Sequence, residues 1–418
     1  MPPKRVYFKT FGCRTNQFDT QVMMASLAHF SVTPDEHEAQ VIVVNSCTVT
    51  NGADASVRQY IRSARRKNPT ARIVLAGCGS HSKGEALYEA DEVHGVMGHS
   101  EKEHIDALLQ RTDRFYEIGD LEHVDRTIVS EFVGKSRAFI KVQEGCDFAC
   151  SYCIIPSVRG GARSYPLVQI EEQVRTLAAN GFGEFILTGT NVGSYGQEIG
   201  TSMAELLQRL SQLRGVRRIR IGSLEPIQID AAFMELLDEP WMARHLHIAL
   251  QHTSDAMLSR MNRRNAYTAD VRLFEHLAER GYALGTDFIV GHPGESEAAW
   301  AEAMTRVDRL PLTHIHAFTY SQRDGTVSAA MTDIVRGDIA KERHRELREK
   351  IAEKNHAFRR RHTDGLNVLI ENGEKGVYNG LDQYFNRVQI LSDEDLSGNW
   401  LTVDNVLAEA KGNTKTLR

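Results

Sequence analysis

Short apolar runs alternate with amphipathic segments through the first part of the chain. Four runs have the length and β-branched content of buried strands: 6–9, 41–44, 72–75 and 93–97. Three segments, each after one of these runs, have helical spacing of apolar residues: about 16–30, 53–67 and 102–109. Strands that alternate with helices in this way indicate a parallel α/β sheet, so residues 1–120 are predicted to form a Rossmann-like α/β domain.

A second strand–helix series begins after residues 121–135, a polar and irregular stretch that we interpret as a linker. Six β-type runs are separated by helical segments: 137–143, 184–189, 218–223, 246–250, 283–291 and 314–320. Six such units predict a partial (β/α)6 barrel over residues 132–362, with its site at the carboxyl ends of the strands. Its last segment, 341–362, is predicted to be a charged helix with little apolar face.

The pattern changes again near the carboxyl terminus. Residues 363–418 contain short β-type runs broken by Asn-Gly and Ser-Gly pairs, which is typical of a small all-β, OB-like barrel. The overall prediction is therefore an α/β protein with a third, all-β domain.

Composition narrows the class of protein without defining its chemistry. Hydrophobic residues make up 41% of the 418 positions and charged residues 25%, as in ordinary globular proteins. The formal net charge of −5 gives no global attraction to nucleic acid, so such a partner would require local basic patches. Neither a signal-peptide pattern nor an apolar run of about 18 residues is present, which predicts a cytoplasmic protein without membrane contact.

Three of the six cysteines directly follow the first three main strands of the amino-terminal series. They are Cys13 in FGCRTN, Cys47 in VVNSCTVTN and Cys78 in VLAGCGS. Because the carboxyl ends of strands in an open α/β sheet share one edge, we expect the three thiols to converge. A single cysteine is more often a buried small side chain, but the regular placement of all three argues against that explanation.

The other three cysteines form a C-x3-C-x2-C motif after the first predicted barrel strand. Cys146, Cys150 and Cys153 can coordinate three irons of a 4Fe–4S cluster and leave the fourth iron open for S-adenosylmethionine (SAM). A structural zinc site would normally have a fourth Cys or His nearby. A C-x2-C redox pair would not explain Cys146.

These motifs resemble those of a known enzyme family. The C-x3-C-x2-C loop resembles the radical SAM superfamily, and the three earlier cysteine segments resemble the amino-terminal domain of the methylthiotransferases. The carboxyl-terminal β segment resembles the TRAM domain, an RNA-binding barrel. The segments TFGCRTNQFDT, NSCTVTNGAD and RAFIKVQEGCDFACSYCIIP resemble the subgroup that modifies N6-threonylcarbamoyladenosine. LQHTSD and CIIPSVRG also resemble the subgroup that modifies an aspartate of a ribosomal protein, and a third subgroup modifies isopentenyladenosine.

The resemblance implies a reaction and a set of cofactors. It implies two 4Fe–4S clusters, one on Cys146, Cys150 and Cys153 and an auxiliary one on Cys13, Cys47 and Cys78. It also implies two SAM molecules per turnover, one to methylate a cluster-bound sulfur and one to supply a radical that activates C2 of adenine. The favoured substrate is N6-threonylcarbamoyladenosine at position 37 of tRNA. The implied partners are the tRNA anticodon loop and an electron donor such as a flavodoxin or ferredoxin, with the enzyme acting as a monomer.

The resemblance also assigns the expected SAM contacts. Tyr152 matches the position that packs on the adenine, and four other groups match positions at strand ends: Gly189, Thr190 and Asn191; Ser223; Glu225; and Gly291. Ordinary turns and loop packing are the competing explanations for these residues. No side chain is expected to act as a catalyst beyond the clusters, and His247 and His252 are interpreted as structural.

Basic residues provide the candidates for RNA contact. Arg58, Arg62 and Arg65 fall on one helical stripe, and further patches include Arg263, Arg264 and Arg360, together with residues 214–220. In the terminal barrel, Tyr378, Tyr384 and Phe385 lie near Lys375 and Arg387 and are predicted to stack on unpaired bases. Solvated charge and core packing are the ordinary alternatives. A non-enzymatic alternative for the whole chain is an iron–sulfur RNA-binding protein.

Overall fold

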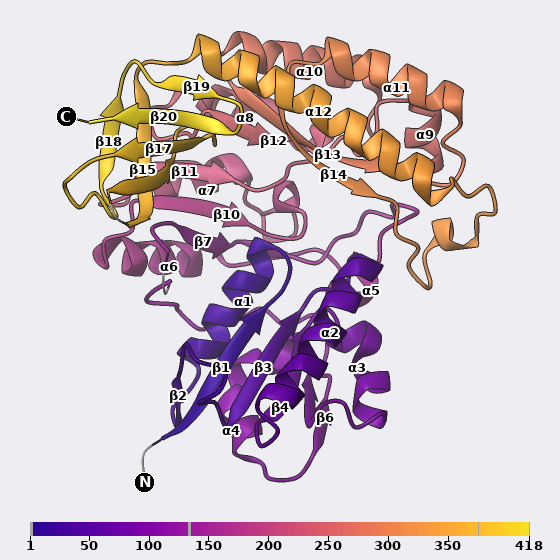
Figure 1. Ribbon diagram of the computed structural model, residues 1–418, viewed down its shortest axis with the longest axis vertical. Coiled ribbons are helices and arrows are strands. Elements are labelled where there is room, and N and C mark those ends of the chain that lie inside the picture. The colour runs from indigo at the N-terminus through magenta and orange to yellow at the C-terminus, as the bar shows by residue number, and fades with distance from the viewer. Residues whose placement is uncertain (1–2, 133–134, 375, 418) are drawn as a thin grey trace.

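The computed structural model describes residues 3–132, 135–374 and 376–417, and its elements form three regions (Figure 1). The amino-terminal region has a parallel sheet in the order β2-β1-β3-β4-β5-β6. Its strands are β1 (Lys4–Thr10), β2 (Phe30–Val32), β3 (Val41–Ser46), β4 (Arg72–Gly77), β5 (Gly95–Met97) and β6 (Phe115–Glu117). Its helices are α1 (Arg14–Ala25), α2 (Asn51–Lys67), α3 (Ser80–Glu89), η1 (His99–His104) and α4 (Ile105–Gln110). The predicted α/β sheet is confirmed, and β2 and β6 are short edge strands that the apolar pattern did not indicate.

Strand β3 shows why this sheet is covered on both faces. Val41 and Val43 pack in one apolar cluster with residues of α1 and α4, whereas Ile42 and Val44 pack in another with α2 and α3. Because successive side chains of a strand point to opposite faces, a continuous run of apolar residues requires helices on each side.

The central region is the predicted partial barrel. Its strands are β7 (Ala138–Lys141), β10 (Glu184–Thr188), β11 (Arg218–Ile221), β12 (His245–His247), β13 (Ala283–Val290) and β14 (Leu312–Thr319). They form two parallel three-stranded sheets, β11-β10-β7 and β12-β13-β14, which single bridges such as Leu224↔Ile248 connect. All six predicted runs are strands, and a small antiparallel pair, β8 (Gln143–Glu144) and β9 (Arg163–Ser164), adds to them.

Helices surround the outside of these strands. They are α6 (Leu167–Ala179), α7 (Met203–Ser211), α8 (Ala231–Glu235), α9 (Asp255–Arg260), α10 (Tyr267–Glu279), α11 (Glu297–Arg309) and α12 (Gly337–Arg361). The short helix α5 (Ile155–Arg159) instead packs near α3 and Cys78 of the amino-terminal region. Short 3-10 helices also occur: η2 (Val192–Ser194), η3 (Pro226–Gln228), η4 (Leu236–Asp238) and η5 (Val327–Ala330). Among the helices that the structure describes, each is too short or too polar to cross a bilayer.

The carboxyl-terminal region is a six-stranded mixed sheet in the order β18-β15-β16-β17-β20-β19. Its strands are β15 (Leu366–Glu374), β16 (Val377–Leu381), β17 (Arg387–Leu391), β18 (Trp400–Val403), β19 (Leu407–Glu409) and β20 (Gly412–Thr416). The sheet wraps around its own core, which includes Val368, Val388 and Ile390. The predicted all-β region is confirmed as a half-barrel.

Helix α12 connects the barrel to this sheet, along the top of Figure 1. The sequence predicted a helix with little apolar face, but Leu347, Ile351 and Phe358 are buried. Near its end, Asn355 Nδ2 donates to Asn386 Oδ1 at 2.9 Å, and Arg359 donates to Gly412 O and to Asn413 Oδ1. The helix is therefore packed against both regions.

The stretch between the first two regions is more than an exposed connection. Its described part, 121–132, has no helix or strand, in agreement with the sequence interpretation. Asp125 is nevertheless fully buried, and Val129 and Phe132 pack into the barrel core together with Phe18 of α1. Helix α1 thus packs against its own sheet and against the barrel.

Candidate functional site

The three amino-terminal cysteines lie at one edge of the parallel sheet. Cys13 follows β1 after a short turn, and Cys47 and Cys78 directly follow β3 and β4, the next two strands of the sheet. Asn16 Oδ1 lies 3.9 Å from Cys13 Sγ and 3.9 Å from Cys78 Sγ. Gly12 has a φ of +97°, and a Cβ there would lie 3.2 Å from Cys47 Sγ. The structure therefore brings this trio together, with glycine needed for the close approach.

The second trio occupies one loop after β8. The Phe148 N–H donates to Cys146 Sγ at 3.4 Å, and the Cys153 N–H donates to Cys150 O at 3.1 Å. A residue after β10 and a residue of the loop between α9 and α10 also reach the thiols. Asn191 Nδ2 lies 3.7 Å from Cys146 Sγ, and Arg263 Nη1 lies 3.6 Å from Cys150 Sγ.

One large cavity, of about 560 Å³, lies between the amino-terminal region and the barrel. It is lined by all three cysteines of the first trio and by Cys153 of the second. Tyr152, Gly189, Thr190 and Ser223 also line it. Four of the six thiols thus face a space large enough for a small-molecule cofactor and a substrate group.

The donor chemistry of the two trios fits iron–sulfur clusters. Among the described residues, the Cys, His, Asp and Glu groups whose ligand atoms all lie within 4.8 Å of one another include no cysteine. Three ligands of one tetrahedral zinc, with bonds of ~2.3 Å, would lie about 3.8 Å apart. The wider spacing of the trios suits a multi-iron cluster, for which thiolates are the usual ligands.

Burial and charge set the protonation of these thiols. Burial raises the pKa of Cys78 and of Cys153 to about 12, and it also raises the pKa of Cys47 and Cys146. The guanidinium of Arg159 opposes this effect at Cys78. Binding iron to these sulfurs would displace their protons, so cluster insertion and thiol ionisation are coupled.

Arg159, at the end of α5, connects the first trio to the barrel. Its Nε donates to Cys78 Sγ at 3.1 Å, and its Nη2 donates to Asn16 Oδ1 at 2.6 Å and Asp19 Oδ2 at 2.9 Å. Its Nη1 also donates to Glu144. The side chain is 2% exposed, and each of its three nitrogens donates a hydrogen bond within the protein.

A buried ionic network continues from Arg159 across the boundary between the two regions. Lys102 Nζ lies 2.9 Å from Asp19 Oδ1 and 2.9 Å from Asp125 Oδ2. Lys141 Nζ contacts the same two carboxylates at 2.5 and 2.6 Å and Glu144 at 3.1 Å. Burial would raise the pKa of these carboxyl groups, but the cations hold the pKa of Asp19 and Glu144 well below the usual range. The network fixes α1 against β7, and with it Cys13 against the barrel.

The predicted SAM-binding residues lie around the second trio, although not all of them line the cavity. Thr190 Oγ1 and Asn191 Oδ1 are buried without a hydrogen-bond partner among the described residues, as expected of groups that await a polar ligand. Glu225 is held by Arg263, with Arg263 Nη1 at 2.9 Å from Glu225 Oε1. Gly291 does not line the cavity; it packs against Ala340 of α12, whose Cβ would lie 2.7 Å from an added Cβ.

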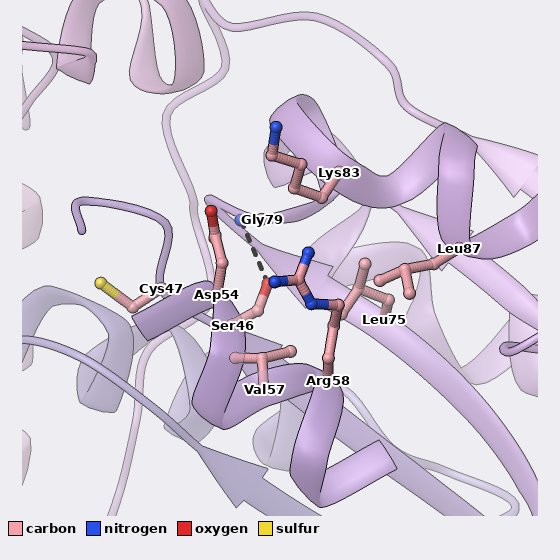
Figure 2. A pocket seen from close by; sticks show the side chains of 9 residues that line it. All are labelled: Ser46, Cys47, Asp54, Val57, Arg58, Leu75, Gly79, Lys83 and Leu87. Carbon is pink, nitrogen blue, oxygen red and sulfur yellow. Dashed lines mark hydrogen bonds between the residues drawn. The ribbon is translucent and has the colours of Figure 1, made fainter. Parts of the chain in front are cut away.

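The RNA-contact predictions divide into exposed and buried residues. Six of the predicted residues are exposed: Arg58, Arg62, Arg65, Arg264, Arg360 and Arg387. Arg62 pairs with Glu92 at 2.9 Å, and Arg65 donates to the backbone O of Asp91. Figure 2 shows Arg58 in the lining of a small cavity of about 10 Å³, whereas the sulfur of Cys47 points away from Arg58.

Other RNA-contact predictions are wrong. The Arg263 side chain is 2% exposed because it pairs with Glu225 beside the second trio, so it belongs to the interior of the site. Arg218 and Arg220 are buried, and each forms an ion pair with Glu184.

The predicted aromatic stacking surface is not free either. Tyr378 is buried in the core of the half-barrel, and Tyr384 packs against Phe358 and His362. Phe385 stacks on His245 with ring centroids 5.0 Å apart. These rings pack within the protein, and Lys375 lies outside the described residues.

The sequence reasoning missed several residues of the cavity. Arg14 and Arg159 line it, as do Asp287, His316 and Gln251. Gln251 has a φ of +65°, a strained conformation for a residue other than glycine that is often found at functional sites. Arg14 follows Cys13 directly and Arg159 lies in the CIIPSVRG segment, so proximity to the cysteine motifs was an available signal for both.

Comparisons with known proteins agree with this architecture. Residues 5–98 match the uncharacterized protein family UPF0004, and residues 140–307 match the radical SAM superfamily. In fold, the chain is similar to the radical SAM methyltransferase TsrM from Kitasatospora setae, with a TM-score of 0.59, 16% identity, and coverage of 78% of this chain and 77% of that one.

Relatives in sequence are more specific. A Helicobacter pylori relative whose name places it among the methylthiotransferases is 52% identical over 405 residues, 96% of each chain. The threonylcarbamoyladenosine tRNA methylthiotransferase MtaB of Aquifex aeolicus is 34% identical over 369 residues, 85% of this chain and 89% of that one. The ribosomal protein uS12 methylthiotransferase RimO of Desulforudis audaxviator is 32% identical over 400 residues, 92% and 87% of the two chains. With two thiol trios on one cavity and relatives of this similarity along its length, the chain belongs to the radical SAM methylthiotransferase family.

Proposed function

We propose that this enzyme adds a methylthio group to C2 of N6-threonylcarbamoyladenosine at position 37 of tRNA. The observation that carries the proposal is the meeting of both cysteine trios at one cavity. Family membership implies a 4Fe–4S cluster on each trio and bound SAM, which together supply the sulfur, the methyl group and the one-electron chemistry that an unactivated C–H bond requires.

The residues of the chain hold and shape this site. Cys13, Cys47 and Cys78 would bind the auxiliary cluster, and Cys146, Cys150 and Cys153 the other. Thr190 and Asn191 offer buried, unsatisfied oxygens toward SAM, and Tyr152 offers a ring. The ionic network of Lys102 and Lys141 keeps the two regions in register, so that the first trio and Cys153 of the second face the same cavity.

The RNA would approach from the surface around the cavity. Exposed arginines at 58, 264 and 360 are the proposed phosphate contacts, and the half-barrel is proposed to add to them as a TRAM-like module. An adenosine next to the anticodon lies in a single-stranded loop, so it can be turned out of its stack and into the cavity. We propose that the enzyme acts in the cytoplasm as a monomer and takes its electrons from a flavodoxin or ferredoxin.

Mass spectrometry of tRNA nucleosides from a strain that lacks the gene tests the substrate. The methylthio form of N6-threonylcarbamoyladenosine should disappear, and the unmethylthiolated nucleoside should accumulate. Re-expression of the wild-type chain should restore the product, whereas a Cys47→Ala chain, the matched control, should not. An unchanged tRNA profile would contradict the proposal.

The similarity to RimO supports a second candidate substrate, an aspartate of a ribosomal protein. The same strain distinguishes the two, since intact-mass analysis of its ribosomal proteins would then show one protein without its methylthio group. That result, together with an unchanged tRNA profile, would assign the enzyme to the protein substrate.

A further inference from the structure

A second, smaller cavity of about 110 Å³ adjoins the large one. Arg14, Ser223 and His316 line both cavities, so the two meet at these residues. The other lining residues come from β11, β12, β14 and the loop after β16: Arg220, Ile221, His245, His247, His314, Ile315 and Phe385. The described lining thus contains two arginines and four histidines but no carboxylate.

The two arginines differ in how their charge is balanced. Arg220 Nε donates to Glu184 Oε1 at 2.6 Å, and its other nitrogens donate to the backbone oxygens of Asp382 and Gln383. Arg14 has no hydrogen-bond or ion-pair partner among the residues that the structure describes; its guanidinium lies 5.4 Å from the ring centroid of Phe385.

Arg14 remains a cation in this setting. An arginine guanidinium group stays protonated in proteins at neutral pH. A half-buried cation without a counter-charge is costly, because it has lost hydration and gained no partner. Its position therefore indicates an anionic ligand that completes the site.

His245 and His314 supply neutral N–H donors around this cation, whereas His247 and His316 contact the carboxylate of Asp287. Burial, with the nearby His247, lowers the pKa of His314 to about 4, and burial also holds the pKa of His245 well below its usual value. His245 Nε2 is buried and has no hydrogen-bond partner within the described structure. Gly285 of β13 makes room for the rings, since a Cβ there would lie 2.7 Å from His247 Nδ1 and 3.2 Å from His245 Nε2.

We propose that this small cavity is a carboxylate subsite in which Arg14 pairs with the threonyl carboxylate of the modified adenosine. The inference rests on the proposed tRNA substrate and deepens it. With about 30 Å³ per water-sized group, the cavity holds roughly four non-hydrogen atoms, the size of a carboxylate and the carbon that carries it. Arginine is suited to such a group because its planar fork can donate two parallel hydrogen bonds. An isopentenyl group has no charge to offer there.

Binding of three anticodon stem–loop RNAs to the cluster-loaded enzyme tests the subsite. The RNAs carry N6-threonylcarbamoyladenosine, isopentenyladenosine or unmodified adenosine at position 37, and fluorescence anisotropy gives each Kd. We expect the wild type to prefer the threonylcarbamoyl RNA by at least about 30-fold, as loss of one partner of a buried charge pair implies. Arg14→Gln should bind all three RNAs alike, and Arg14→Lys should regain part of the preference.

The controls separate this inference from the proposed function. Arg272→Gln, on the exposed side of α10 and outside both cavities, should keep the full preference. Iron content of each variant verifies that the neighbouring Cys13 still binds its cluster. If Arg14→Gln loses iron, Gly285→Ala is tested in its place. The added methyl group narrows the small cavity at a point away from the cysteines, so this variant should also reduce the preference for the threonylcarbamoyl RNA.

The outcomes are distinct. If Arg14→Gln discriminates as well as the wild type, or if it loses iron and Gly285→Ala discriminates as well as the wild type, the carboxylate subsite is refuted and the tRNA substrate stands. A wild type that binds the three RNAs equally would overturn both the subsite and the proposed tRNA substrate.

Discussion

The two cysteine trios offer the same kind of ligand, a thiolate, but the chain brings their cysteines together in different ways. Cys146, Cys150 and Cys153 lie within eight residues of one loop, so local chain geometry alone keeps them close. Cys13, Cys47 and Cys78 are spread over three strand ends and meet only because β1, β3 and β4 are neighbours in a parallel sheet. The closeness of the amino-terminal trio therefore depends on tertiary structure, whereas the closeness of Cys146, Cys150 and Cys153 depends on a local motif.

Their surroundings differ in the same sense. Around Cys78, Arg159 belongs to a buried network with Lys102 and Lys141 that ties two regions of the protein together. Around Cys150, Arg263 makes one paired contact with Glu225, within the barrel. A site that depends on tertiary contacts should respond more to changes elsewhere in the fold than a site that depends on one loop.

Single cysteine replacements should give the largest effects and separate the two sites. Reconstituted wild type is expected to hold about eight irons per chain, and Cys150→Ala or Cys47→Ala about four. Cys150→Ala should form no 5′-deoxyadenosine from SAM, whereas Cys47→Ala should still form it but yield no methylthiolated product. Iron analysis and chromatography of the SAM products measure both. Formation of 5′-deoxyadenosine by Cys150→Ala would contradict the assignment.

Replacing the two arginines should show that the first trio depends more on its environment. Arg159→Leu leaves Asp19 and Glu144 short of a buried counter-charge, which should lower the free energy of unfolding by about 3–5 kcal/mol. Arg263→Leu leaves one carboxylate, that of the partly exposed Glu225, without its cation and the Ala249 carbonyl without its donor, at a cost of about 1–3 kcal/mol. Urea unfolding of the apo proteins measures both losses. Equal losses would mean that the network does not distinguish the two sites.

The hydrogen bond from Arg159 to Cys78 Sγ predicts a second effect at the same position. Removing a positive charge beside a thiolate ligand makes addition of an electron to its cluster less favourable, so the reduction potential of the auxiliary cluster should fall. Potentiometric titration followed by electron paramagnetic resonance gives this value. Arg159→Lys, which keeps the charge, should show a smaller change, and Arg263→Leu should leave the potential of this cluster unchanged.

Protonation of His314 should make the protein less stable to unfolding at acid pH. In the unfolded chain this histidine takes up a proton near pH 6.5, whereas burial lowers its folded pKa to about 4. Between these values the unfolded state binds more protons, so the free energy of unfolding falls as the pH decreases, by at most about 1.4 kcal/mol per pH unit from this group. His314→Gln should remove that part of the slope between pH 6.5 and 4, as urea unfolding at several pH values would reveal. An unchanged slope would rule out His314 as its source.

The smallest effects are expected at the surface near the first trio. Arg58→Ala should weaken binding of tRNA modestly and lower the slope of log affinity against log salt by about 0.7–0.9, the value for one phosphate contact. Arg62→Ala should change the slope less, because its guanidinium already pairs with Glu92. Filter binding at several salt concentrations measures the slopes. A larger change of the slope for Arg62→Ala than for Arg58→Ala would contradict the assignment of Arg58 as a phosphate contact.

The periodic elements could be predicted from sequence because each has a strong local signal. The four amino-terminal runs and the six barrel runs are all strands, since continuous apolar runs of this length have few alternatives to a buried strand. The short edge strands β2 and β6 were missed because three residues carry too little periodicity to be distinguished from a loop.

Side-chain environment was harder to predict than the elements. Arg263 and Arg220 look like surface charge in the sequence, yet tertiary contacts with Glu225 and Glu184 bury them. Tyr384 and Phe385 look like a stacking surface, but the helix and strands of neighbouring regions cover them. The partner that decides burial lies 38 residues away for Arg263 and 36 residues away for Arg220, and no local pattern records such a contact.

Helix α12 determines how rigidly the half-barrel is held relative to the barrel. At 1.5 Å per residue its 25 residues extend over about 38 Å, and bonded contacts near its end clamp the half-barrel to it. A continuous helix that is bonded to the half-barrel therefore connects it to the barrel, in place of a flexible linker. If the half-barrel binds RNA as proposed, that RNA would be held at a fixed distance from the cavity.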